Sequence, residues 1–491
     1  MVKKALSDLE PRKVFQYFEE ISAIPRGSGN EKGISDHILA WARERGLAAV
    51  QDEYLNLIIK KPASGGYENA DAVLLQAHLD MVCEKKSDSC HDFTQDPIPL
   101  RVEGDMIISA AGTTLGADNG IGVAYCMAVL DDDSLAHPPL EILLTTEEET
   151  TFNGAESVSP RHFSARRLIN LDQAVDDEVL AGSCGGEGAI LRLPLRYMVQ
   201  APRRPQETAF SLRISGLPGG HSGEDIHRGH GNAIQLLARA LCTCRTIDGL
   251  RLADLSGGTG RTAIPREAEA VITVDRDKET ELRQSLEKLE AVFQTEYRAA
   301  APGLRLELKR LDAAAGLPSL TEDALEKLLA FLYLMPDGIM QMNGAAPGVV
   351  ESSINLGVAR LTETGLELTA EMRNAYDSTT IHMEDRLSFL CRTFGAGCEF
   401  FTKYRPWSFN PHSPLREKAA EVYEGEFGKP LKTVVVHAGI ECGSLLAKLP
   451  DLDAISIGPN CWFFHSPEER MSISSVGRAW QFLVKLLAEL R

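Results

Sequence analysis

The sequence predicts an α/β protein, with a mostly parallel sheet covered by helices and an inserted α+β domain of two similar halves. Nearly continuous apolar segments alternate with helix patterns at both ends of the chain, as in sheets that are buried on both faces. Between them, after about residue 195, the pattern changes to strands and amphipathic helices with one charged face. We therefore expect one domain formed by residues 1–200 and 400–491, interrupted by a second at 201–399.

The first 200 residues contain short apolar segments typical of buried strands, together with helix patterns. An amphipathic helix is expected because Val14, Phe15, Phe18 and Ile21 recur at helical spacing. Strands are expected where short apolar segments run without interruption. The expected elements are strands at 55–60, 72–82, 140–148 and 167–172, and helices at 10–22 and 119–130.

The inserted segment repeats a strand and helix cycle twice, without a clear sequence repeat. Its expected strands lie at 210–217, 268–277, 304–312, 355–363 and 366–374, and its helices at 231–241, 279–297, 322–334 and 381–394. The first pattern then resumes, with helices at 414–427 and 472–490 and strands at 433–437 and 453–459. The sheet of the first domain is therefore expected to be split by the insertion.

Composition limits the classes of function. The net charge of −19, from 51 basic and 70 acidic residues, argues against binding to nucleic acid or anionic membranes. No apolar stretch approaches the roughly 18 residues of a membrane span, and the N-terminus lacks the apolar core of a secretory signal, so a cytoplasmic protein is expected. The ten cysteines form no CxxC pair and are expected to be reduced. A catalytic or binding role of the thiol stays open for Cys184 and Cys442, which lie in glycine-rich segments.

Side chains that bind metals stand where the apolar segments end. His78 and Asp80 lie two residues apart and so point to the same side of a strand, where a carboxylate can orient an imidazole ligand. Asp118 precedes a helix, whose N-terminus favours an anion. Each has a plain structural alternative. His78 could simply be hydrogen-bonded to a nearby acid, and Asp118 could be a helix N-cap.

Further candidates follow the later strands of the first domain. Glu147, Glu148 and Glu149 end one strand and Asp172 ends the next, while His465 follows the strand near 453–459. A solvated acidic loop and a packed loop histidine are the alternatives for the glutamates and for His465. Taken together, two histidines and three acids would meet at one edge of one sheet. Such mixed ligation suits zinc, with manganese or cobalt as substitutes, and a bridging carboxylate fits two ions.

The motifs resemble those of the aminoacyl-histidine dipeptidases (cytosolic Xaa-His dipeptidases, peptidase D). These belong to the aminoacylase- and carboxypeptidase-like dizinc peptidases. The resemblance covers nearly the whole chain, and the motifs occur in the same order as in the family. Its motifs are AHLDMV, GTTLGADNGIG, TEEE, NLDQA, GGHSGEDIHRGHGNA, AIPREA, HAGIECG and IGPNCWFFHSPEE.

The resemblance implies two Zn²⁺ per chain, one held by His78 and Asp172 and the other by Glu149 and His465, with Asp118 between them. It also implies that Glu148 is the general base and that Asp80 orients His78, although a register slip of one residue would move the base to Glu147. In the inserted domain, which would act as a lid, His221 would stabilise the oxyanion and Arg373 the substrate carboxylate, while Glu441 could meet the ammonium. A turn residue and a strand-surface arginine are the alternatives for His221 and Arg373.

The implied activity is hydrolysis of unblocked dipeptides, of the Xaa-His type such as carnosine or with broader specificity. Two departures from the family pattern bear on specificity: Thr262 stands where relatives have Asn, and Thr150-Thr151 replaces a small Ala-Gly step. They leave room for an aminoacylase or a tripeptidase of the same group. A non-catalytic metal-binding scaffold is the alternative of another class. A homodimer is a possible assembly.

Overall fold

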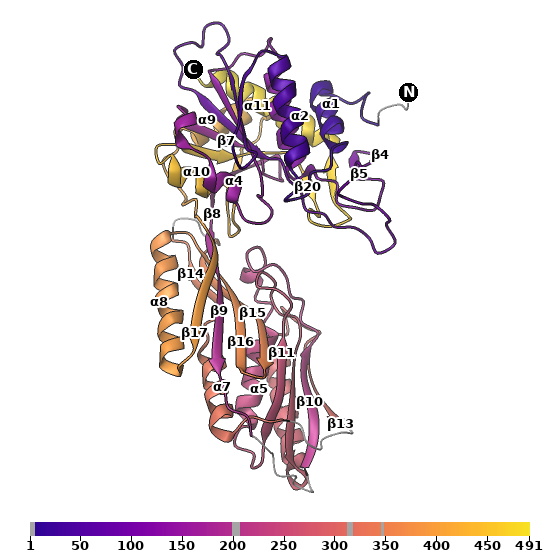
Figure 1. The fold of residues 1–491 in the computed structure, drawn as a ribbon, viewed down its shortest axis with the longest axis vertical. Coiled ribbons are helices and arrows are strands. Elements are labelled where there is room, and N and C mark those ends of the chain that lie inside the picture. The colour runs from indigo at the N-terminus through magenta and orange to yellow at the C-terminus, as the bar shows by residue number, and fades with distance from the viewer. Residues whose placement is uncertain (1–4, 199–206, 312–317, 345–347) are drawn as a thin grey trace. The chain divides into compact units, whose positions relative to one another are not determined.

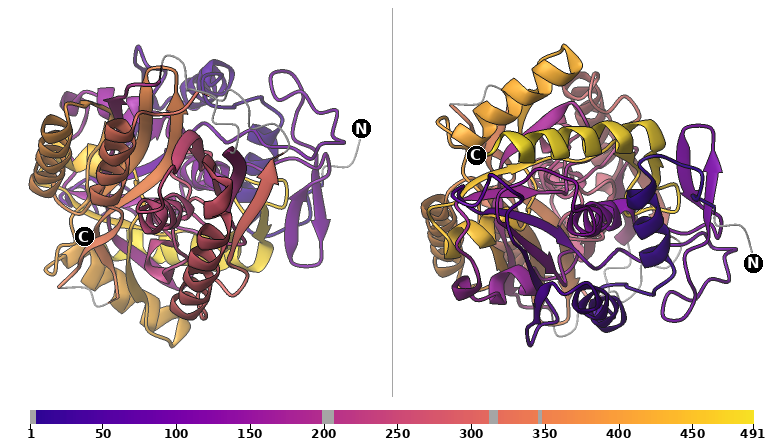
Figure 2. Two further views of the ribbon diagram at one scale, coloured as in Figure 1. Left: turned by 90° about the horizontal axis from the view of Figure 1, so that it is seen from below. Right: turned by 90° about the horizontal axis from the view of Figure 1, so that it is seen from above.

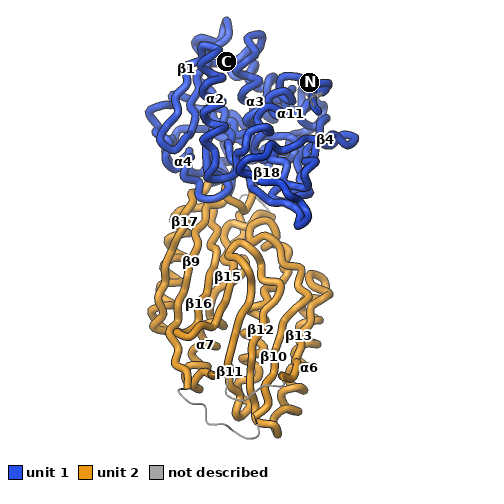
Figure 3. The backbone as a smooth tube through the Cα atoms, turned by 45° about the vertical axis from the view of Figure 1, so that its right-hand side comes forward, with its two compact units in different colours: residues 1–183, 407–435, 440–491 blue, residues 184–406, 436–439 orange. Residues whose placement is uncertain are grey.

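The computed structural model describes residues 5–198, 207–311, 318–344 and 348–491. Its chain divides into two units, coloured separately in Figure 3. Unit 1 comprises residues 1–183, 407–435 and 440–491, and unit 2 comprises residues 184–406 and 436–439. The unit boundaries differ from the expected ones at 200 and 400, because strands β9 (Gly185–Pro194) and β17 (Gly397–Tyr404) pair within the sheet of unit 2.

The sheet of unit 1 has the strand order β1-β2-β6-β3-β7-β19-β8-β18. Its centre is parallel, since β3 pairs in parallel with β6 and β7, and β19 pairs in parallel with β7. Every residue of β3 and β6 is buried, which explains their uninterrupted apolar sequences. The strands are β1 (Ala48–Gln51), β2 (Leu57–Lys61), β3 (Val73–His78), β6 (Leu140–Thr145), β7 (Arg167–Asn170), β8 (Glu178–Ser183), β18 (Lys432–Val436) and β19 (Asp453–Ser456).

Helices surround this sheet and share one hydrophobic core with it. The C-terminal helix α11, yellow in Figure 2, packs against α9, and α1 packs against α3. The helices are α1 (Arg12–Ser22), α2 (Lys32–Glu44), α3 (Ala117–Leu130), α4 (Asn153–Ser157), α9 (Pro414–Phe427), α10 (Cys442–Lys448) and α11 (Ile473–Glu489), with the short 3-10 turn η1 (Pro160–His162). The predicted α/β class is confirmed.

Unit 1 also carries a small sheet in the order β20-β21-β5-β4, which was not predicted. Its strands have two to four residues each, too few for an alternating pattern to stand out. They are β4 (Leu100–Glu103), β5 (Met106–Ser109), β20 (Cys461–Trp462) and β21 (Arg470–Ser472).

Unit 2 contains one long antiparallel sheet in the order β13-β10-β12-β11-β15-β16-β9-β17, with β14 paired to β15 (Figure 1). Its two halves meet at β11 and β15, which pair only through Ser256 with Arg360 and Gly257 with Ala359. The strands are β9, β10 (Glu207–Ser215), β11 (Arg251–Gly257), β12 (Ala268–Asp275), β13 (Arg305–Leu311), β14 (Gly338–Met342), β15 (Val350–Thr362), β16 (Gly365–Asn374) and β17.

Four longer helices pack on this sheet and form the second hydrophobic core. They are α5 (Ala233–Cys244), α6 (Glu279–Glu296), α7 (Glu322–Leu334) and α8 (Asp377–Phe394), beside the 3-10 turns η2 (Ile226–Arg228) and η3 (Arg276–Lys278). Within the described ranges, no helix combines the length and apolar composition needed to cross a membrane.

A polar contact ties α5 to the sheet of unit 2. The side chain of Asn232 caps α5 by accepting from the Ile234 N–H at 2.9 Å, and its amide donates to Asp337 Oδ1 at 2.9 Å. The Leu356 N–H also donates to Asp337 Oδ1, at 2.8 Å. Burial nevertheless raises the pKa of Asp337 to about 6. The folded protein therefore retains a proton that the unfolded chain releases, and unit 2 loses stability as the pH rises from about 4 to about 6.

We expect Asp337→Asn to stabilise the protein at pH 7.5 by roughly 1–2 kcal/mol and to have little effect at pH 4.5, because an amide keeps the acceptor oxygen without the buried charge. Urea unfolding followed by circular dichroism at the two pH values measures this. Asp248→Asn, at an exposed turn residue, is the matched control. Equal effects of Asp337→Asn at both pH values would contradict the expectation.

Candidate metal centre

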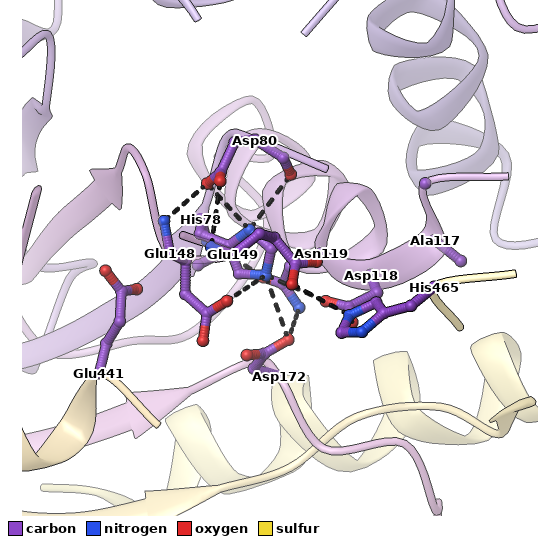
Figure 4. A network of polar contacts seen from close by, with 12 residues as sticks. His78, Asp80, Ala117, Asp118, Asn119, Glu148, Glu149, Asp172, Glu441 and His465 are labelled. Atoms are coloured by element: carbon purple, nitrogen blue, oxygen red, sulfur yellow. Dashed lines mark hydrogen bonds and ion pairs between the residues drawn. The ribbon is translucent and has the colours of Figure 1, made fainter. Parts of the chain in front are cut away.

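His78 and Asp80 lie at the carboxyl end of β3, as Figure 4 shows. Asp80 is fully buried and accepts hydrogen bonds from the Ser28 hydroxyl at 2.8 Å and from the Glu148 and Glu149 N–H groups at 3.1 and 3.2 Å. Its Oδ1 lies 3.4 Å from His78 Nδ1. Asp80 therefore joins the ends of β3 and β6, and His78 Nε2 is left facing the other predicted ligands.

Asp118 lies between the two predicted histidine ligands. Its Oδ1 is 3.0 Å from His78 Nε2, and its Oδ2 is 3.3 Å from His465 Nε2. Asp118 belongs to the first turn of α3 but has non-helical backbone angles (φ −79°, ψ 106°), so its side chain leaves the helix direction. Each oxygen of one carboxylate therefore faces a different imidazole, which is the arrangement that a bridging ligand requires.

Glu149 and Asp172 complete the group of predicted ligands. Glu149 Oε2 is 3.0 Å from His465 Nε2, and Asp172 Oδ1 is 3.7 Å from His78 Nε2. The Asn119 amide donates to Asp172 at 2.6 Å. Glu149 Oε1 is buried and has no hydrogen-bond partner among the described residues. The five predicted ligands therefore come together, with an unsatisfied oxygen left among them.

The charges in this group are poorly balanced without a cation. Burial, together with Asp118, raises the pKa of Asp172 well above its ordinary value and also raises that of Glu149. Burial would raise the pKa of Asp118 too, but hydrogen bonds from His465 and His78 outweigh it and hold that pKa low. His78, Asp118 and Glu149 offer one ligand atom each within 4.8 Å of one another, a spacing that can hold an ion. Imidazole and carboxylate donors suit a divalent transition metal.

Two further acids lie beside these ligands. Glu148 Oε2 is 4.0 Å from His78 Nε2, and Glu147 turns away to hydrogen-bond with Thr151 and Asn153. Glu441 is buried and accepts hydrogen bonds from Gln76 and Thr145, each at 2.6 Å. Its Oε1 has no partner in the described part of the chain.

His221 and Arg373 belong to unit 2, where they contact each other. Arg373 is buried, and its Nη2 lies 3.2 Å from His221 Nε2. Its other nitrogens donate to the Ser222 hydroxyl at 3.2 Å and to the Tyr404 hydroxyl at 2.8 Å. Tyr404 was not identified from the sequence, because nothing in β17 marks it as a partner of an arginine on β16. The alternative of a strand-surface arginine does not hold for Arg373, because its side chain is buried.

The two cysteines left open by the sequence are buried and free. Burial raises the pKa of Cys184 to about 11, and it raises that of Cys442 well above the ordinary value. A thiol that stays protonated near neutral pH is a poor nucleophile, so these cysteines are better explained as core residues.

Comparison with known proteins shows the chain's relatives. The model of the family described as "Peptidase family M20/M25/M40" matches residues 74–489. The chain is 38% identical over 486 residues to the cytosol non-specific dipeptidase of Escherichia coli K12, covering 99% of each chain. The structure of aminoacylhistidine dipeptidase from Vibrio alginolyticus superposes with a TM-score of 0.89, at 34% identity over 98% of this chain and 97% of that one.

A more distant structure shares the fold alone. An aminopeptidase from Bacillus cereus matches with a TM-score of 0.55 and 12% identity, covering 98% of this chain and 99% of that one. The resemblance seen in the motifs is thus confirmed over nearly the whole chain.

We expect Zn²⁺ to raise the melting temperature of the metal-free protein, because it binds only where the folded chain brings the ligands together. At 100 times Kd the gain is about 2.7 kcal/mol. Differential scanning fluorimetry measures the shift. Asp118→Ala should lose most of it, while His412→Ala, at an exposed histidine of unit 1, should keep it. A full shift in Asp118→Ala would place the ion elsewhere.

Proposed function

This chain belongs to the peptidase family M20/M25/M40 and is a metallopeptidase, and we propose that it hydrolyses dipeptides whose amino and carboxyl ends are both free. The observation that carries the proposal is the position of Asp118, whose two oxygens face His78 and His465. The near full-length similarity to two proteins named as dipeptidases supports the substrate class.

We further propose that two Zn²⁺ occupy the site, one at His78 and Asp172 and one at Glu149 and His465, with Asp118 shared. Manganese or cobalt are expected to substitute, because the same ligands accept them. A bound metal pair supplies an acidified water and a positive charge beside the scissile carbonyl. Asp80 holds the His78 ring through Nδ1, which keeps Nε2 free to bind.

Glu148 is the proposed general base. Its carboxylate lies beside the ligands, 4.0 Å from His78 Nε2, without being hydrogen-bonded to either histidine. It would accept a proton from the attacking water and pass that proton to the leaving amine. Glu147 is the competing candidate, but its carboxylate is engaged by Thr151 and Asn153.

Glu441 and Arg373 are proposed to recognise the two ends of the dipeptide. The partnerless Oε1 of Glu441 is suited to the substrate ammonium. The buried guanidinium of Arg373, which matches a carboxylate in shape and charge, is suited to the C-terminus. His221, in contact with Arg373, is proposed to stabilise the oxyanion.

The decisive experiment is a substrate panel on the zinc-loaded protein: carnosine, other Xaa-His dipeptides, unrelated dipeptides, a tripeptide and N-acetyl amino acids. We expect turnover of free dipeptides. A preference for Xaa-His dipeptides would agree with the name of the Vibrio alginolyticus relative, an aminoacylhistidine dipeptidase. Turnover of many dipeptides would agree with the name of the Escherichia coli relative, a non-specific dipeptidase. Hydrolysis of acylated substrates or tripeptides alone would favour the aminoacylase or tripeptidase alternatives, to which Thr262 and Thr150-Thr151 point.

The expected cytoplasmic location is supported by the Escherichia coli relative, which is named a cytosol dipeptidase.

For the base, we expect Glu148→Gln to lower kcat by about 10²–10⁴-fold with zinc affinity little changed, because it removes the proton acceptor and not a ligand. Steady-state kinetics and a chelator competition assay measure the two quantities. Glu147→Gln is the matched control and should retain most activity. The reverse result would assign the base to Glu147.

For the substrate ends, we expect Arg373→Lys to raise KM for a dipeptide and leave KM for its C-terminal amide unchanged, because the paired guanidinium contact is lost. Glu441→Gln should in the same way reduce discrimination between a free and an N-acetylated dipeptide. KM values for the free dipeptide, its C-terminal amide and its N-acetylated form measure both effects. A uniform fall in kcat with all substrates would contradict these roles.

A further inference from the structure

Glu469 carries a hydrogen-bonding arrangement that the proposed mechanism does not use. Its side chain is buried in unit 1, with 2% of the residue exposed. Oε2 accepts from the N–H groups of Leu115 at 2.6 Å and Gly116 at 2.9 Å, and Oε1 accepts from those of Ala117 at 2.8 Å and Asp118 at 3.3 Å. One carboxylate therefore binds four consecutive N–H groups that end at the proposed bridging ligand.

The segment that contributes Glu469 also contributes His465, four residues earlier. His465 has a φ of 60°, a left-handed conformation that non-glycine residues rarely adopt. Such a conformation persists only where the surrounding structure holds it. His465 is half exposed, so its burial does not hold it in place. The hydrogen bonds of Glu469 instead attach this segment to the one that contributes Asp118.

Arg26 binds the opposite side of the same loop. It is buried, it donates to the carbonyl of Gly116, and its Nη1 donates to the carbonyls of Leu79 and Asp80 at 3.0 Å each. The N–H of Gly116 thus binds Glu469 while its carbonyl binds Arg26. A Cβ on residue 116 would lie 2.6 Å from Arg26 Nη2, so only glycine leaves room for this contact.

We propose that Glu469 is a positioning residue that sets the separation of Asp118 and His465, and hence the affinity of the site for the metal that these two ligands share. Arg26 connects the same loop to the end of β3 by hydrogen bonds. Three segments that carry proposed ligands, those of His78, Asp118 and His465, therefore meet at Gly116. The inference rests on the proposed metal site, and it adds a determinant of metal affinity outside the ligands themselves. Partners of this kind are generally worth about 10–100-fold in metal affinity.

The test compares Glu469→Gln with Glu468→Gln, its exposed neighbour, whose carboxylate lies 3.5 Å from Lys86. An amide in place of Glu469 presents an NH₂ group to two of the four N–H donors. We expect it to weaken Zn²⁺ binding by about 10–100-fold in chelator competition, and to change the visible spectrum of the Co²⁺-loaded protein. kcat should fall with KM little changed. Glu468→Gln should match the wild type in each measurement.

Three results would overturn the proposal: an unchanged Zn²⁺ affinity and Co²⁺ spectrum in Glu469→Gln, equal losses in both variants, or a loss confined to the urea stability of the metal-free protein. If Glu469→Gln fails to fold, Glu469→Asp decides, since it keeps the charge but is too short to reach all four N–H groups. Its Zn²⁺ affinity should fall, and an unchanged affinity would overturn the proposal. Wild-type protein that binds Zn²⁺ without cleaving dipeptides would refute the proposed activity alone.

Discussion

The main constraint on unit 1 is that its fold gathers several charged side chains around Asp118. Three carboxylates and two imidazoles meet within hydrogen-bonding or near-contact distance, in a place where burial disfavours ionised acids. Like charges held so close are unfavourable without a compensating cation. The surrounding fold brings them together nevertheless, because β3, β6 and β7 lie side by side in parallel and their carboxyl ends share one edge.

Backbone hydrogen bonds to two buried carboxylates help to hold this arrangement in place. Asp80 accepts from two N–H groups that follow β6, and Glu469 accepts from four N–H groups at the start of α3. A carboxylate that accepts from several N–H groups is held at a defined position, and it satisfies backbone donors that would otherwise need water. Two buried acids outside the proposed ligand set therefore fix the backbone beside the proposed ligands.

Unit 2 has a separate polar centre built on its own sheet. Arg373 on β16 contacts His221, Ser222 and the Tyr404 hydroxyl, and Tyr404 in turn donates to Glu371 at 3.0 Å. A buried guanidinium matches a carboxylate in shape and charge, which suits it to recognition of an anionic group. The two-half sheet provides this centre through β9, β16 and β17, which pair side by side.

The local sequence pattern predicts most of the buried strands and the candidate site residues, but it does not predict several strands of unit 2. Buried strands such as β3, β6 and β7 appear as apolar runs, and a polar residue at the end of such a run is a candidate site residue. His78, Glu149 and Asp172 are candidates of this kind. Strands β8, β9, β11 and β17 were not expected, because their sequences contain glycine or alternate weakly. In addition, β8, β9 and β17 pair with strands that lie far away in the chain. The domain boundaries shifted for the same reason.

Residues with a purely supporting part could not be identified from the sequence at all. Glu469 reads as one more acid in a polar loop, and Arg26 and Tyr404 have no local feature that names their partners. Their roles arise from contacts such as that between Glu469 and Leu115, which lie more than 350 residues apart. Residue type and spacing dictate which groups can ligate a metal, since that is local chemistry. Which groups hold those ligands in register is decided by tertiary contacts, because only folding brings a buried carboxylate to a distant row of backbone N–H groups.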